Sequence, residues 1–126
     1  MTNSKDMNRR PIIEKAIVSE NMSEIEKFQN KTLRPIIKMK HELLIAYFEN
    51  YLANKKIDFK NLSVIKKAEV TNLTFLKDNQ FRNELKGIII GHFTLEEFIL
   101  YKNFSKESNK RIINMVKERL LSTLIS

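Results

Sequence analysis

The chain contains no cysteine, and its 126 residues include only two glycines and two prolines. Without cysteine it can have no disulfide framework, no thiolate zinc site and no cysteine nucleophile. All-β folds need many tight turns and usually contain more glycine and proline than this chain does. The composition therefore favours a helical protein.

Long uninterrupted apolar runs are also missing. Met1 to Arg10 is polar, and the apolar stretch that follows is interrupted by Glu14 and Lys15. A membrane-spanning helix needs about 20 consecutive apolar residues, and a secretory signal needs a longer run than this one. We therefore expect a cytoplasmic protein that makes no membrane contact.

The residues that are present can build a single core. Hydrophobic residues make up 42% of the chain, which is enough for one domain of this length. We expect residues 22–126 to form an all-α domain, a compact bundle of five to six helices. Residues 1–21 are expected to be an N-terminal arm that is partly disordered or docked on a partner.

Capping residues and apolar spacing predict where the helices begin and end. Ser23 and Glu26 have the spacing of a capping box, which opens a short helix to about Asn30. Thr32 is the expected cap of a long helix that runs to about Asn54, with Pro35 tolerated in its first turn. Further helices are predicted over about 63–76, 79–90 (capped by Asp78) and 95–104. Ser105 is the expected cap of the last helix, unless that helix is continuous with the one before it.

The helix over 63–76 has the least support. Val64, Ile65, Leu73 and Leu76 are apolar residues that favour it. Val70, Thr71 and Thr74 oppose it, because β-branched side chains lower helix propensity.

The two glycines lie four residues apart, at Gly87 and Gly91. Gly91 follows an apolar helical run and is predicted to end that helix in a left-handed conformation. Gly87 is predicted to allow a close contact between helices. Thr94 and Glu97 have the spacing of a second capping box, so a new helix should begin directly afterwards. We expect a sharp turn here between two helices that pack against each other.

The last helix is apolar over more than one narrow seam. Its apolar residues are Ile112, Ile113, Val116, Leu120, Leu121, Leu124 and Ile125. A monomer of this size can bury one such face, so the second face should need a partner. The pattern predicts self-association, with a homodimer as the expected form.

The net charge of +8 suggests a nucleic-acid partner, because Lys and Arg neutralise phosphates. However, residues 1–40 carry nine basic and five acidic groups, residues 41–78 six and five, and residues 79–126 eight and five. An excess spread in this way favours solvated helix faces. In a nucleic-acid-binding protein the phosphate contacts would be Arg9, Arg10, Lys38, Lys40, Lys66, Lys67, Lys110 and Arg111.

No catalytic constellation stands out in the sequence. The stretch from Lys86 to Gly91 lacks the Gly-Lys-Ser/Thr ending of a phosphate loop and follows no parallel strand. His41 and His92 match no established ligand spacing, so we expect no metal and no cofactor. A functional polar cluster assembled by the long helix and the Gly91 turn would consist of Arg34, His41, Lys86, His92 and Tyr101.

Three stretches carry a resemblance to known sequences: residues 28–38, residues 86–98, and residues 109–112 with Met115 and Glu118-Arg119. They resemble a group of small bacterial proteins often labelled "glyoxalase", over most of the chain after about Met22. That label implies a metal-dependent lyase, here with His41, His92 and a glutamate as ligands. Glyoxalase I enzymes are built from βαβββ modules, whereas this chain is predicted to be helical and matches none of their ligand positions.

Three functional hypotheses follow. The first is a non-enzymatic interaction or regulatory module, because apolar helix surface is abundant and a catalytic constellation is missing. The second is a basic protein associated with nucleic acid, whose binding would fall steeply with added salt. The third, a metal-dependent lyase, is disfavoured.

Overall fold

The computed structural model describes residues 23–125, so the predicted N-terminal arm lies outside the described residues. Over the described range the chain is helical and has no strand, which confirms the all-α fold class. In chain order the elements are α2 (Glu24–Phe28), the π-helical turn η2 (Gln29–Leu33), α3 (Arg34–Met39), α4 (His41–Asn54), the 3₁₀ turn η3 (Phe59–Asn61), α5 (Val64–Lys77), α6 (Asn79–Ile90), α7 (Leu95–Tyr101), the 3₁₀ turn η4 (Lys102–Phe104) and α8 (Ser105–Leu124). None of these helices combines the length and the apolar content that a membrane crossing requires.

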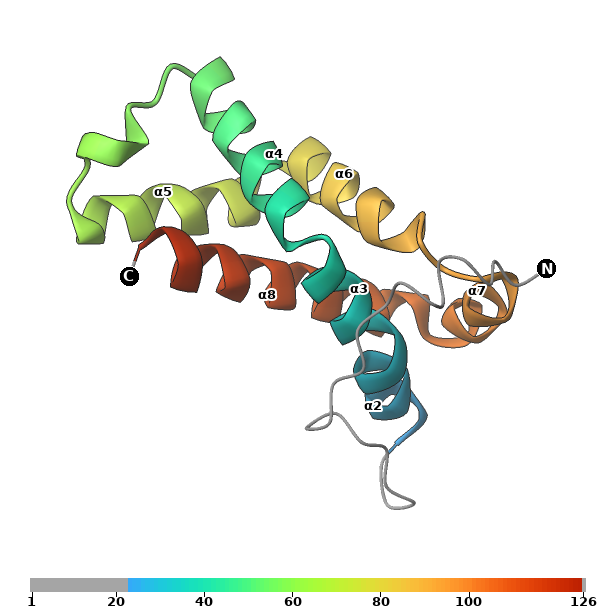
Figure 1. The fold of residues 1–126 in the computed structure, drawn as a ribbon. Coiled ribbons are helices and arrows are strands. Elements are labelled where there is room, and N and C mark those ends of the chain that lie inside the picture. The colour runs from blue at the N-terminus through green and yellow to red at the C-terminus, as the bar shows by residue number, and fades with distance from the viewer. Residues whose placement is uncertain (1–22, 126) are drawn as a thin grey trace.

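The first helical stretch runs without interruption from α2 through η2 into α3 (Figure 1). Ser23 caps α2 as predicted, because its hydroxyl oxygen accepts the Glu26 N–H at 3.2 Å. The prediction that Thr32 caps a new helix is wrong, since Thr32 lies inside η2 and its backbone is helical. The wider π turn gives room for Pro35, whose ring would otherwise clash with the carbonyl of Lys31 four residues earlier.

The predicted long helix is divided at Lys40. Its backbone angles are φ −96° and ψ 15°, outside the helical region, so α3 ends at Met39 and α4 begins at His41. The hydrogen bonds nevertheless continue across the break, because the Lys40 N–H donates to the Ile36 carbonyl at 2.9 Å. The break places His41 in the first turn of a new helix.

Helix α5 buries a different face from the one that its apolar residues suggest. Ser63 caps it, and Thr71, Thr74 and Phe75 are its buried residues. Both threonine hydroxyls donate to the carbonyl four residues earlier, at 2.9 Å, so their burial leaves no hydroxyl unsatisfied. The small threonines face α6 and α8, while the larger apolar side chains Val64, Ile65, Leu73 and Leu76 are exposed.

Helix α6 begins at Asp78 and ends before Gly91, both as predicted. Two details of the prediction are wrong. Gly91 is right-handed, with φ −61° and ψ −13°, so the turn does not rely on a left-handed residue. A Cβ atom at Gly87 would meet nothing within 4 Å, so no close helix contact requires this glycine.

The turn after α6 leads into the predicted capping box at Thr94 and Glu97, which is fully formed at the start of α7. A 3₁₀ turn then joins α7 to α8. Ser105 is not a cap, because the turn η4 keeps its backbone helical, at φ −61° and ψ −40°. The cap position of α8 is Phe104, which makes no side-chain capping bond.

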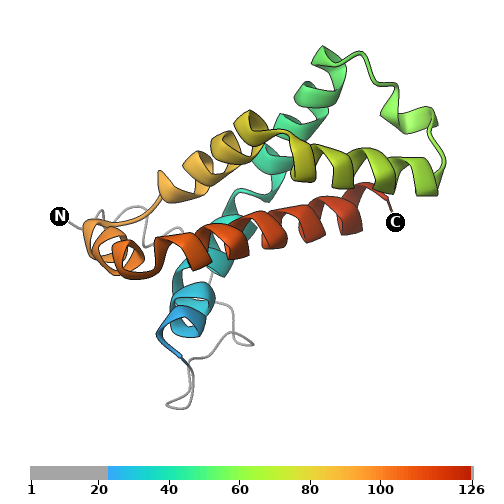
Figure 2. The ribbon, with the colours of Figure 1, turned by 180° about the vertical axis from the view of Figure 1, so that it is seen from behind.

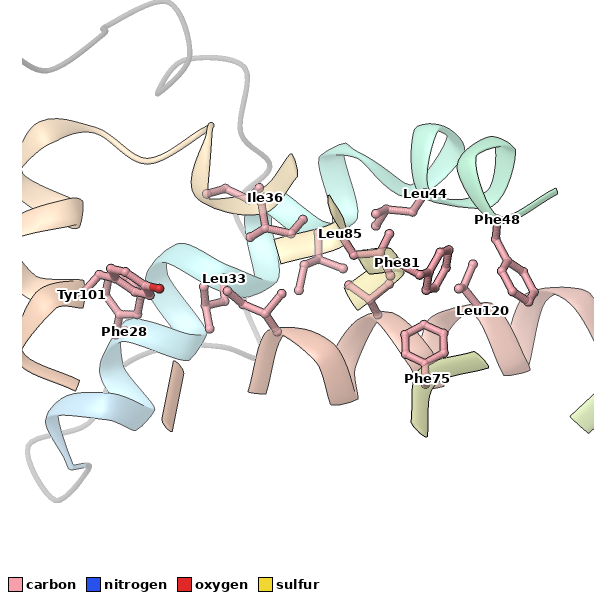
Figure 3. Close-up of a cluster of buried hydrophobic side chains, with 14 of the residues drawn as sticks. Phe28, Leu33, Ile36, Leu44, Phe48, Phe75, Phe81, Leu85, Tyr101 and Leu120 are labelled. Atoms are coloured by element: carbon pink, nitrogen blue, oxygen red, sulfur yellow. The ribbon is translucent and has the colours of Figure 1, made fainter. Parts of the chain in front are cut away.

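Helix α8 is the central element of the core. It packs against α4, α5, α6 and η2, and both views show it running beside α5 in the opposite direction (Figures 1 and 2). Ile112, Val116 and Leu120 are fully buried at a spacing of four residues. The core extends as a band from Phe28 and Tyr101 at one end to Phe48 at the other (Figure 3).

Part of the second apolar face of α8 is covered by the same chain. Ile113, Met115 and Leu124 pack against the core, and no large apolar side chain of this helix is among the exposed ones. Leu121 and Ile125 are half-buried and are not among the residues packed against the core, so self-association through this helix stays a prediction.

We predict that Gly87→Ala raises the free energy of unfolding by about 0.5–1 kcal/mol, since alanine is the better helix former and the site is open. Gly91→Ala is the matched control, because its Cβ would lie 3.0 Å from the Gly87 carbonyl oxygen and should give no gain. Urea denaturation of both variants measures the difference. A loss of stability in Gly87→Ala would show that this glycine has a packing role.

Candidate interaction site

Helix α7 turns most of its apolar side chains toward solvent. Leu95, Phe98 and Ile99 lie on one face at helical spacing and are 53%, 41% and 51% exposed. Leu100 beside them is 46% exposed, and Tyr101 is the buried residue of this helix. Contiguous exposed apolar residues of this kind mark a contact surface. We call Leu95, Phe98, Ile99 and Leu100 the α7 face.

The capping box and one long-range bond fix the start of α7. The Glu97 N–H donates to the Thr94 hydroxyl oxygen at 3.1 Å, and the Thr94 N–H donates to a Glu97 carboxylate oxygen at 2.8 Å. The other carboxylate oxygen accepts the Thr32 hydroxyl at 3.1 Å. Glu97 therefore ties α7 to η2, and this explains why Thr32 is buried within a helix instead of capping one.

Aromatic rings hold the opposite side of α7 in place. The Tyr101 hydroxyl donates to the Asn109 side-chain oxygen at 2.7 Å, and the Tyr101 ring lies 5.4 Å from the Phe93 ring. Phe28 packs edge-on against both Phe93 and Phe104, at 5.5 and 5.4 Å. Because α7 is anchored on its buried side, its exposed face is pre-organised for contact.

A hollow of about 340 Å³ adjoins the α7 face. Phe28, Leu100 and Phe104 supply its apolar wall, and Lys27 and Lys31 stand on the α2 and η2 side. Leu100 belongs to both the hollow and the α7 face. The accessible apolar surface therefore extends from α7 toward α2.

The predicted polar cluster is only partly brought together. Arg34 and His41 line two neighbouring hollows that share Lys38 and Arg119. A nitrogen of the Arg119 guanidinium lies 3.1 Å from His41 Nδ1. Sequence reasoning did not include Arg119, because it follows His41 by 78 residues and only the packing of α8 joins them.

The other three residues of that cluster lie elsewhere. Lys86 is half-buried on α6, His92 is half-buried in the turn before α7, and Tyr101 belongs to the aromatic anchor of α7. None of the three lines either hollow. Of the five residues of the predicted cluster, only Arg34 and His41 therefore lie at neighbouring hollows.

The basic residues proposed for nucleic acid do not converge on one surface. Arg9 and Arg10 lie outside the described residues. Lys66 pairs with Glu69 at 3.4 Å, and Arg111 pairs with Glu107 at 3.4 Å. Lys66 and Lys110 lie near the N-terminal ends of α5 and α8, and these antiparallel helices place those ends far apart (Figure 2).

The Lys67 ammonium faces the Phe59 ring at 5.8 Å, and Lys38 and Lys40 are near the break between α3 and α4.

For metal binding, the described residues contain no group of three His, Asp or Glu side chains that could hold an ion.

A second polar site, missed by sequence reasoning, joins α4 to the start of α6. The Tyr51 hydroxyl donates to one Asp78 carboxylate oxygen at 2.8 Å, and the Phe81 N–H donates to the other at 2.9 Å. The Phe81 N–H bond and then the Tyr51 bond lower the pKa of Asp78. Burial and then the Asp78 bond raise the pKa of Tyr51. The sequence predicted Asp78 as a cap but gave no signal for Tyr51, 27 residues earlier.

No family model, curated protein or solved structure matches this chain.

The lowered pKa of Asp78 predicts a specific loss of stability in acid. The stabilisation is fully present above the ordinary carboxyl pKa of about 3.9 and is lost as pH falls through the lower folded value. We expect Asp78→Asn to melt at a lower temperature than the wild type at pH 7. This difference in melting temperature should vanish once the pH lies below the pKa of Asp78 in the folded protein. Thermal melts from pH 2 to pH 7 give the comparison.

Asp58→Asn is the control for that experiment, because Asp58 is an exposed carboxylate with a local bond to Asn61 only. It changes the net charge by the same amount. A pH-independent difference between wild type and Asp78→Asn would contradict the assignment.

Proposed function

We propose that this chain is a non-enzymatic interaction module that forms a homodimer through the α7 face. The observation that supports it is the exposure of four large apolar side chains on a seven-residue helix whose other side is firmly anchored. Helix α5 also exposes four large apolar side chains, but they are spread from Val64 to Leu76, whereas those of α7 lie within Leu95 to Leu100.

The ends of α7 favour a second copy as the occupant. Its first turn is acidic, with Glu96 and Glu97, and Lys102 follows its last residue. When two copies of α7 lie antiparallel across a twofold axis, the acidic end of each helix faces the basic end of the other. The helix dipoles are then also opposed, which is the favourable arrangement.

The expected affinity is modest. Burying each half-exposed side chain contributes on the order of 1 kcal/mol, and a symmetric contact buries two copies of the α7 face. Association costs at least about 4 kcal/mol in lost translational and rotational freedom. The remainder, about 4 kcal/mol or less, corresponds to a dissociation constant of about 1 mM or weaker.

We therefore predict a concentration-dependent monomer–dimer equilibrium that Ile99→Glu shifts to monomer, because the interface would then bury an unpaired charge. Analytical ultracentrifugation from about 0.1 to 2 mM covers the expected range. Leu73→Glu is the matched control: Leu73 is also 51% exposed, but it lies on α5, which Figure 1 shows well separated from α7.

The control variant should dimerise like the wild type, and circular dichroism should show both variants folded. A wild-type protein that stays monomeric over the whole range would contradict the proposal. Equal weakening by Ile99→Glu and Leu73→Glu would contradict the assignment of the interface to α7.

A further inference from the structure

A cationic groove separates α3 from the C-terminal half of α8, distinct from the α7 face. Its volume is about 610 Å³, which lies in the range of small-molecule sites. Arg34 and Lys38 are one turn apart on α3, and Arg119 faces them from α8. Ile37 and Met115 provide an apolar floor, and Ile37 is fully buried. We call this the α3–α8 groove.

The three cations of the groove have no acidic partner among the described residues. Lys27, Lys66 and Arg111 each have a carboxylate within 4 Å, whereas Arg34, Lys38 and Arg119 have none. Glu118 lines the same groove without forming an ion pair there. Three positive charges against one negative charge leave a local excess that an anion would neutralise.

Two of the cations are held in position by neutral groups. The Arg34 Nε donates to the Asn30 side-chain oxygen at 3.0 Å, which leaves both terminal nitrogens for another acceptor. Arg119 donates to His41 Nδ1 at 3.1 Å, since arginine is always the donor. Neither bond neutralises the guanidinium charge, so both remain available to an oxyanion.

Hydroxyl groups complete the wall of the groove. Ser122 donates its proton to the Arg119 carbonyl at 3.1 Å and so helps to fix the last turns of α8. Thr123 also lines the groove and carries a hydroxyl donor. Planar guanidinium groups, an ammonium and a hydroxyl are the donors that proteins use for phosphate.

We propose that the α3–α8 groove binds a small molecule that carries a phosphate group. Arg34 and Arg119 hold the phosphate oxygens from opposite walls, and Lys38 adds a third positive charge. The apolar floor contacts the rest of the molecule, because the groove is much larger than a phosphate ion. His41 positions Arg119 and does not itself need to contact the ligand.

Titration with inorganic phosphate, at ionic strength held constant with sodium chloride, tests this proposal by NMR of backbone amides. We expect saturable shifts of amides in α3 and in the C-terminal half of α8. Arg34→Gln and Arg119→Gln should each weaken binding about tenfold, the loss typical of one charge-assisted hydrogen bond. Arg34 is exposed, so its variant should fold even if Arg119→Gln does not.

Lys110→Gln is the matched control, because Lys110 is an exposed cation on the same helix outside the groove. Binding unchanged in this control would support the site. Unsaturable shifts, or equal weakening in all variants, would overturn it. A single-stranded oligonucleotide that binds more tightly than phosphate and loses affinity with Lys110→Gln would instead indicate general attraction of a polyanion, and would also overturn it.

Discussion

The carboxylate of Asp78 joins α4 to α6, at the corner on which the rest of the fold is built. One oxygen caps α6 through the Phe81 N–H, and the other accepts the Tyr51 hydroxyl from α4. Arg82 then donates to the carbonyls of Phe75 and Leu76 at the end of α5, both at 2.7 Å. The polar backbone groups at the corner between α5 and α6 therefore have hydrogen-bond partners on both helices.

The Phe81 side chain adds apolar packing to the hydrogen bonds at this corner. Its ring contacts Tyr47, Phe48, Tyr51 and Phe75, with centroid distances between 4.7 and 5.8 Å. Helices α5 and α6 are therefore fixed relative to α4, and α8 packs against all three. With α8 in that position, its N-terminal half supports α7 through Asn109. In its C-terminal half, Arg119 contacts His41 at the start of α4 and faces α3 across the α3–α8 groove. Both proposed sites depend on this one placement.

Local signals were enough to predict most helix boundaries, and long-range contacts explain the errors. Ser63, Asp78 and the Thr94–Glu97 box act within four residues, so the sequence reveals them directly. The role of Thr32 depends on Glu97, which lies 65 residues away. The buried face of α5, with Thr71 and Thr74, depends on the packing of α6 and α8 against it, which the local pattern of apolar residues does not reveal. Arg119 escaped prediction for the same reason, since only packing brings it to His41.

The two proposed sites rely on different interactions, apolar burial in one and electrostatic attraction in the other, and they share no lining residue. The α7 face offers apolar area without net charge, whereas the α3–α8 groove offers charge over a small apolar floor. One structural element nevertheless contacts both. Thr32 bonds to Glu97 of α7, and Arg34, two residues further along the same continuous helix, lines the groove. If α7 moved, either the Thr32–Glu97 hydrogen bond would break or Thr32 would move with α7. The contact that orients the α7 face therefore also constrains the position of the Arg34 backbone.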